Sequence, residues 1–185
     1  MTSAPSVAAL AAAAFLFAAV PAVAGDHPLA APGAPFVFAG GDGERERVRA
    51  AIDEAVAGMS FIIRPIARRR LTAGNRVFET LTVAREGEDL VVDRDGVVVR
   101  SPADGSPADW TGSDGKAYRV SQRLTPAGLV QTFDGKDGTR ENTFSLAEDG
   151  TLRVEVVVRS ARLPAPLAYA LTYARRGGRG GDAHP

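Results

Sequence analysis

Cysteine is absent from the sequence, and only two histidines occur, His27 near the amino end and His184 near the carboxyl end. The central part of the chain therefore supplies no Ser-His or Cys-His pair for nucleophilic catalysis and no histidine ligand for zinc. Glu79 is the one acid expected on the apolar face of a strand, and a single carboxylate does not make a general acid–base pair. We expect no enzymatic activity, no metal and no cofactor.

Net charge is lacking as well, because 22 basic residues balance 22 acidic ones. Without an overall positive field the chain has no general attraction for nucleic acid, and we expect no such partner. The acidic stretches 93–96 and 134–141 offer oxygen ligands, but neither matches the twelve-residue calcium loop. We interpret the recurring Asp-Gly pairs as tight turns, since glycine readily adopts the positive φ that such turns need.

The amino end carries an apolar run, residues 7–20, which is too short to span a bilayer. Pro21 and the Ala22-Val23-Ala24 sequence follow, a pattern typical of a secretory signal peptide, although no Lys or Arg precedes the run. We predict a periplasmic or secreted protein from which residues 1–24 are removed. An uncleaved N-terminal anchor is the alternative.

Residues 25–41 are rich in Pro, Ala and Gly without periodicity, which predicts a flexible arm. Apolar residues then recur at helical spacing, at Val48, Ile52, Ala55, Met59, Ile63 and Ile66. This predicts one amphipathic helix with a kink or break near Arg64, because Pro65 removes a helical hydrogen bond. The final residues, 176–185, have nothing to bury and are predicted to form a disordered tail.

From Arg76 onward, apolar and polar residues alternate with the period of a strand. Eight strands are predicted, at 76–84, 90–93, 97–100, 116–123, 128–134, 140–147, 151–160 and 167–175. Their short connections predict a mainly β fold, an antiparallel up-and-down meander. Such a meander tends to curl into a barrel or half-barrel, because closure removes exposed edges.

Two hairpins can be given a register by placing their apolar residues on one face. If Leu146 opposes Leu152, the loop is 148–150 with glycine last, which is a favoured three-residue hairpin. In the other hairpin Leu124 opposes Leu129. Gln122 then faces Gln131 on the otherwise apolar side of the sheet.

A signal peptide, a helix and a meander of about eight strands resemble the lipocalin-like (calycin) barrels of small secreted bacterial proteins. The resemblance is one of layout and covers about 76–175, within a domain that we place at 42–175. The Gly-x-Trp of lipocalins near the first strand is missing, and the only tryptophan, Trp110, stands in a predicted loop. The resemblance implies uptake of a small apolar molecule into the barrel, and it transfers no functional residue.

The candidate ligand-binding residues fall into two groups. Polar side chains on the apolar face are Tyr118, Gln122, Gln131, Tyr169 and Tyr173. A few polar groups among apolar walls are typical of a ligand pocket, but a filled core in which the two glutamines satisfy each other gives the same pattern.

The second group is Arg64 and Arg68, which share a helix face. They predict an anion site at the barrel mouth, or peripheral contact with an acidic membrane surface. Favourable charge at a helix C-terminus is the structural alternative.

We therefore predict an exported, non-enzymatic module that binds a small apolar or amphipathic ligand, including an anionic one. The alternative is an envelope or protein-interaction protein whose barrel is fully packed. The interior distinguishes them, because ligand pockets usually have volumes of several hundred Å³.

Overall fold

The computed structural model describes residues 27–31 and 35–176. The strands are β1 (Phe36–Phe38), β2 (Thr80–Glu86), β3 (Asp89–Arg94), β4 (Val97–Pro102), β5 (Ala108–Thr111), β6 (Ala117–Thr125), β7 (Gly128–Gly135), β8 (Gly138–Leu146), β9 (Leu152–Arg159) and β10 (Leu167–Arg175). They form one antiparallel sheet in the order β4-β3-β2-β1-β10-β9-β8-β7-β6-β5. The predicted mainly β meander is confirmed, with ten strands instead of about eight.

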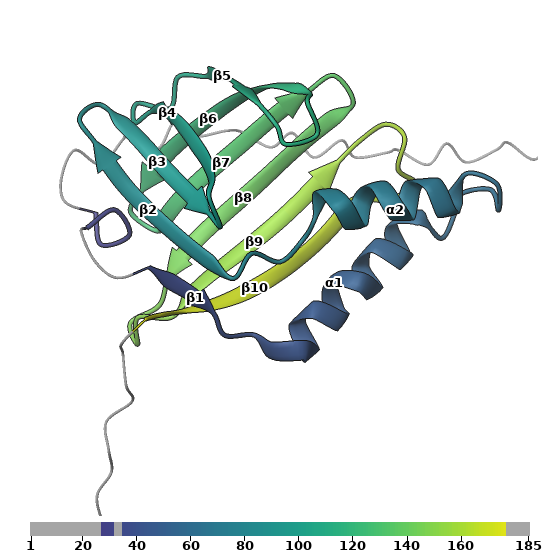
Figure 1. The fold of residues 1–185 in the computed structure, drawn as a ribbon, viewed down its shortest axis with the longest axis horizontal. Coiled ribbons are helices and arrows are strands. Elements are labelled where there is room, and N and C mark those ends of the chain that lie inside the picture. The colour runs from purple at the N-terminus through teal and green to yellow at the C-terminus, as the bar shows by residue number, and fades with distance from the viewer. Residues whose placement is uncertain (1–26, 32–34, 177–185) are drawn as a thin grey trace, which may run out of the picture.

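The two strands that the sequence did not predict are the shortest. β1 has three residues and β5 has four, too few to show a period of two. Trp110, expected in a loop, lies in β5 and donates from Nε1 to the carbonyl oxygen of Val98 on β4 at 3.0 Å. This contact joins the two ends of the sheet and leaves a nearly closed barrel (Figure 1).

Both predicted hairpin registers are confirmed. Leu146 pairs with Leu152 across β8 and β9, and the intervening turn ends at Gly150 with φ 82°. Gln122 pairs with Gln131 across β6 and β7. The inward faces of β2, β3 and β6 to β10 form the main core, together with one face of a helix.

The predicted helix is broken before Arg64 into two helices, α1 (Gly41–Val56) and α2 (Arg64–Gly74), so the break that we expected near Arg64 is confirmed. The chain leaves the helical path over 57–63, before the proline, and Pro65 stands in the first turn of α2. Proline is favoured there, because the first N–H groups of a helix have no partner within it. Among the described residues no helix has the length and apolar character needed to cross a bilayer.

Helix α1 lies beside β10, where β1 is too short to cover the strand (Figure 1). The buried carboxylate of Glu44 accepts hydrogen bonds there from the backbone N–H of Thr172 at 2.7 Å and from its hydroxyl at 2.8 Å. A side chain thus satisfies a backbone donor that has no neighbouring strand. Val48, Ile52 and Ala55 bury the same helix in the core.

The segment predicted as a flexible arm, 25–41, is partly structured. It contains β1, and both Leu29 and Phe36 are buried in the core. A single apolar residue can be buried without belonging to a periodic pattern, so the pattern did not predict this. His27 is also buried, with Nδ1 accepting a hydrogen bond from the N–H of Leu29 at 3.2 Å, so the fold does contain a histidine. The predicted signal peptide, 1–24, and the tail beyond 176 lie outside the described residues.

Candidate functional site

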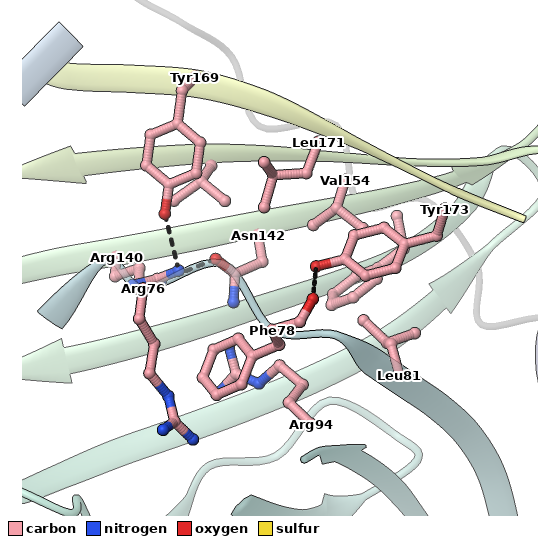
Figure 2. A pocket seen from close by; sticks show the side chains of 12 residues that line it. Arg76, Phe78, Leu81, Arg94, Arg140, Asn142, Val154, Tyr169, Leu171 and Tyr173 are labelled. Carbon is pink, nitrogen blue, oxygen red and sulfur yellow. Dashed lines mark hydrogen bonds between the residues drawn. The ribbon is translucent and has the colours of Figure 1, made fainter. Parts of the chain in front are cut away.

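Buried apolar side chains from most of the strands pack inside the barrel. Beneath the α2–β2 connection lies a cavity of about 10 Å³, room for roughly one water molecule. Its lining combines apolar residues with three arginines (Figure 2), namely Arg76, Phe78, Leu81, Arg94, Arg140, Asn142, Phe144, Val154, Val156, Tyr169, Leu171 and Tyr173. Pockets for drug-sized ligands are usually about 300–1,000 Å³, so this cavity as folded has no room for an apolar tail.

A row of amide side chains crosses this interior on neighbouring strands. Gln122 donates from Nε2 to the carbonyl oxygens of Leu90 at 2.9 Å and Val99 at 3.4 Å. Gln131 donates to Gln122 Oε1, and Asn142 donates to Gln131 Oε1, both at 2.8 Å. The three amides are at most 1 % exposed and each is satisfied within the fold. Gln122 and Gln131 thus pair as the filled-core alternative predicted.

Arg140 continues the row to the mouth of the barrel. Its Nε donates to Asn142 Oδ1 at 2.9 Å, and its Nη1 donates to Gly74 O at 2.9 Å and to Asn75 Oδ1 at 3.1 Å. Its Nη2 donates to the Tyr169 hydroxyl at 3.3 Å, and that hydroxyl donates to Asn75 Oδ1 at 3.1 Å. Four hydrogen bonds therefore fix the Arg140 guanidinium between β8, β10 and the end of α2.

Arg94, at the end of β3, is held very differently. Its side chain is 8 % exposed, its Nε has no hydrogen-bond partner, and none of the described acids pairs with it. The guanidinium lies 5.0 Å from the ring centre of Phe78 and 5.6 Å from that of Phe133. Burial lowers the pKa of Arg94 to about 10, and repulsion from Arg140 acts in the same direction. The site thus contains a buried cation without a counter-charge.

Arg76 adds a third guanidinium, exposed and 4.6 Å from the ring centre of Phe78. The nearby carboxylate of Asp95 is occupied elsewhere, since it accepts hydrogen bonds from the N–H groups of Glu79 and Thr80 at 2.9 and 2.7 Å. Burial would raise the pKa of Asp95, but these hydrogen bonds outweigh it and lower the pKa. The charge of Arg76 also acts on Asp95, but among the described residues none of the three arginines forms an ion pair.

Phe78, in the connection between α2 and β2, also lines the site. Its carbonyl oxygen accepts a hydrogen bond from the Tyr173 hydroxyl at 3.1 Å, which ties the α2–β2 connection to β10 (Figure 2). Burial raises the pKa of Tyr173, whose side chain is 2 % exposed. Tyr169 and Tyr173 thus both lie at the cavity, where the sequence placed them on the inner face.

Tyr118 lies apart from these residues. It packs with Trp110 and Phe133 in a separate small cluster and donates its hydroxyl to Asp114 at 3.2 Å. The structure therefore places Tyr169 and Tyr173 at the cavity and Gln122 and Gln131 in the amide row that leads to it, whereas Tyr118 packs against Phe133 and does not line the cavity. Whether any of them binds a ligand stays a prediction.

Arg64 and Arg68 lie outside the barrel, on α2. Arg64 donates from Nη2 to the carbonyl oxygens of Ala57 and Met59, both at 2.8 Å, and so caps the end of α1. Arg68 pairs with Asp53 of α1 at 2.6 Å. Both contacts join the two helices and neither residue lines the cavity, so their predicted role in holding an anion stays a prediction.

Sequence reasoning did not identify the arginines inside the barrel, although a signal for them existed. Arg94 shares the parity of Leu90 and Val92, but the predicted strand ended one residue earlier. Arg140 shares the parity of Phe144 in the same way. The described residues contain no group of three His, Asp or Glu side chains that could hold a metal.

No family model and no curated protein matches the sequence. Among solved structures the chain is similar to human cRBP IV, with a TM-score of 0.48 and 14% identity over 80% of this chain and 99% of that chain. It is also similar to Caenorhabditis elegans lipid binding protein 8 (TM-score 0.47, 11% identity, 78% and 94%) and to the fatty-acid-binding protein of Manduca sexta (0.45, 14%, 78% and 98%). The similarity is one of fold alone.

Proposed function

We propose that the protein is a non-enzymatic binding module for an anionic amphiphile, whose acidic head group is held by Arg94, Arg140 and Arg76. The observation that carries this proposal is the buried Arg94 guanidinium without a counter-charge. An uncompensated buried charge destabilises a fold by several kcal/mol. Buried groups that lack a partner in this way tend to occur at functional sites. A bound carboxylate would supply the missing partner of Arg94.

The surroundings of Arg94 suit recognition of a planar anion. Arg140 is already fixed by four hydrogen bonds, and Arg94 is restrained by two aromatic rings, so little side-chain entropy remains to be lost. A guanidinium binds carboxylate through two parallel hydrogen bonds, which gives both geometry and strength.

The apolar walls below the arginines are the place for a tail. Leu81, Phe144, Val154 and Leu171 line the same cavity. Because the cavity is small, a tail enters only if the α2–β2 connection with Phe78 moves outward. We place this activity in the periplasm or outside the cell, a setting that rests on the sequence pattern of residues 1–24.

Isothermal titration with dodecanoate and with dodecanol tests the proposal. A charge-assisted hydrogen bond contributes roughly 1.5–3 kcal/mol, so Arg94→Met should weaken the acid about tenfold to a hundredfold and leave the alcohol unchanged. Arg159→Met, at an exposed position of β9, is the matched control. Equal weakening of both ligands by Arg94→Met would make Arg94 a fold element.

A packed-barrel interaction protein is the second candidate, because the filled interior favours it. If the unmutated protein binds neither the acid nor the alcohol, this second function replaces the first.

A further inference from the structure

The connection between the two helices presents an unusual group of exposed apolar side chains. Phe61 is 82% exposed, Ile62 66%, Ile63 56% and Ile66 47%. Large apolar residues scattered singly over a surface are ordinary, but four exposed ones within six positions of the chain are not. We call these four residues, together with Arg69 and Arg70, the interhelical patch.

The exposure follows from an ordered backbone. Ile63 and Arg64 both donate their N–H groups to the carbonyl oxygen of Ser60, at 3.1 and 3.0 Å. The Arg64 side chain clamps the preceding turn by its hydrogen bonds to Ala57 and Met59. The fold thus holds Phe61, Ile62 and Ile63 outward while their own backbone is satisfied.

Positive charge adjoins the apolar residues. Arg69 and Arg70 stand three and four positions after Ile66 on α2, which places them beside it on the same face. Both are exposed, and neither forms an ion pair within the described part of the chain. Arg68, by contrast, is engaged with Asp53 on the side that faces α1.

We propose that the interhelical patch inserts into the surface of an anionic lipid bilayer. Phe and Ile side chains would lie at the boundary of head groups and acyl chains, and the guanidinium groups of Arg69 and Arg70 would reach lipid phosphates. The patch is at an extremity of the molecule, where α1 and α2 meet away from the barrel (Figure 1). A narrow projecting tip suits insertion between lipids better than the broad contact of a protein partner. This inference does not depend on the proposed anion site.

Vesicle co-sedimentation of the full chain tests the inference. Vesicles of phosphatidylcholine alone are compared with equal mixtures of phosphatidylcholine and phosphatidylglycerol, and only the mixture should bind. Ile62→Ser with Ile63→Ser should weaken binding about tenfold or more, since each substitution removes an exposed side chain that burial in lipid would favour. Arg69→Gln with Arg70→Gln should weaken it by a similar factor, and more so at low salt.

Matched controls come from other surfaces of the chain. Val98→Ser removes an apolar side chain that is 47% exposed on β4, and Arg85→Gln with Arg159→Gln removes two exposed arginines. These variants should bind vesicles as the unmutated protein does. Equal loss in the control and patch variants would overturn the inference, as would no binding to either vesicle. Sedimentation equilibrium tests whether the patch instead binds a second copy of the chain. The inference would also be overturned if the protein self-associates, the patch variants abolish that self-association, and no vesicle binding occurs.

The absence of cysteine permits a direct measurement of depth. Ser60→Cys introduces a single thiol beside Phe61, and an attached environment-sensitive fluorophore should shift to the blue with the mixed vesicles. The same label at Ala147→Cys, on the exposed β8–β9 turn, should not shift. A shift at both positions would indicate adsorption without a preferred orientation and would contradict insertion by the patch.

Discussion

Replacing Arg94 with methionine should stabilise the protein while it weakens binding of the anion. The pKa of Arg94 falls to about 10 on burial. The gap from the higher ordinary pKa of a guanidinium corresponds to about 3 kcal/mol, at about 1.4 kcal/mol per pH unit. Loss of the contacts with Phe78 and Phe133 offsets part of this; at 5.0 and 5.6 Å from the ring centres, near the outer limit for such contacts, each is worth roughly 0.5–1 kcal/mol. We expect a net gain of about 1–2 kcal/mol in the free energy of unfolding.

Urea and thermal unfolding at neutral pH measure this gain, which corresponds to a rise in Tm of about 2–4 °C per kcal/mol for a chain of this size. Arg140→Met is the matched control with the opposite expected sign, because it removes four hydrogen bonds and leaves Asn75 and Tyr169 without that partner. If Arg94→Met destabilises the fold as Arg140→Met does, the reasoning about an uncompensated cation is refuted.

The pH dependence of the free energy of unfolding tests independently whether Arg94 destabilises the fold. The folded-state pKa of Arg94, about 10, lies below the unfolded value, so at pH values between the two the unfolded chain binds more protons than the folded one. The penalty from Arg94 is therefore complete below about pH 10 and is relieved as the pH rises through that window. The difference in free energy of unfolding between Arg94→Met and the unmutated protein should therefore decrease in this pH range. Both proteins contain the same tyrosines, so the effect of tyrosine ionisation cancels in that difference.

Two further predictions concern the core and the amino end. Leu152→Asp should cost several kcal/mol, because Leu152 is fully buried away from the arginines. Val156→Asp, on the same face of β9, should reduce the free energy of unfolding less. Val156 lines the arginine cavity, so a carboxylate there can pair with Arg94 or Arg140. Equal losses for the two variants in urea unfolding would contradict a vacant anion site. Amino-terminal sequencing of exported protein should begin at Gly25, and finding Met1 on it would remove the basis for export.

Sequence patterns were sufficient where alternation and turn chemistry agreed. The pairing of Leu146 with Leu152 followed from the apolar face and from Gly150, and the pairing of Gln122 with Gln131 followed from the neighbouring leucines. Patterns failed where an element was short or its role depended on a distant partner. Three residues of β1 show no period, and their position depends on pairing with β10, more than 130 positions later in the chain.

The candidate site was hidden for a related reason. The period-two pattern identifies a strand by the apolar residues on its inner face. An arginine at an inward position interrupts that pattern, so the predicted strand ends before it. Arg94 was lost in this way at the boundary of β3. By contrast, the arginines that the sequence emphasised, Arg64 and Arg68, have local partners across the helix pair, and no pattern within the helix predicts the Asp53 contact.

The arrangement inside the barrel makes two opposing contributions to the free energy of ligand binding. The head-group side is prepared in advance, because the amide row fixes Arg140 through Asn142 and leaves only Arg94 unsatisfied. The tail side is unprepared, because the cavity of about 10 Å³ must open before any apolar chain can enter. Each buried methylene favours binding by about 0.8 kcal/mol, whereas opening imposes a single cost independent of tail length. Affinity for carboxylates should therefore be weak or flat for short acids and rise steadily once the barrel has opened. If affinity stays flat from butanoate to dodecanoate, the head group binds at a closed barrel and the arginine site serves a small anion.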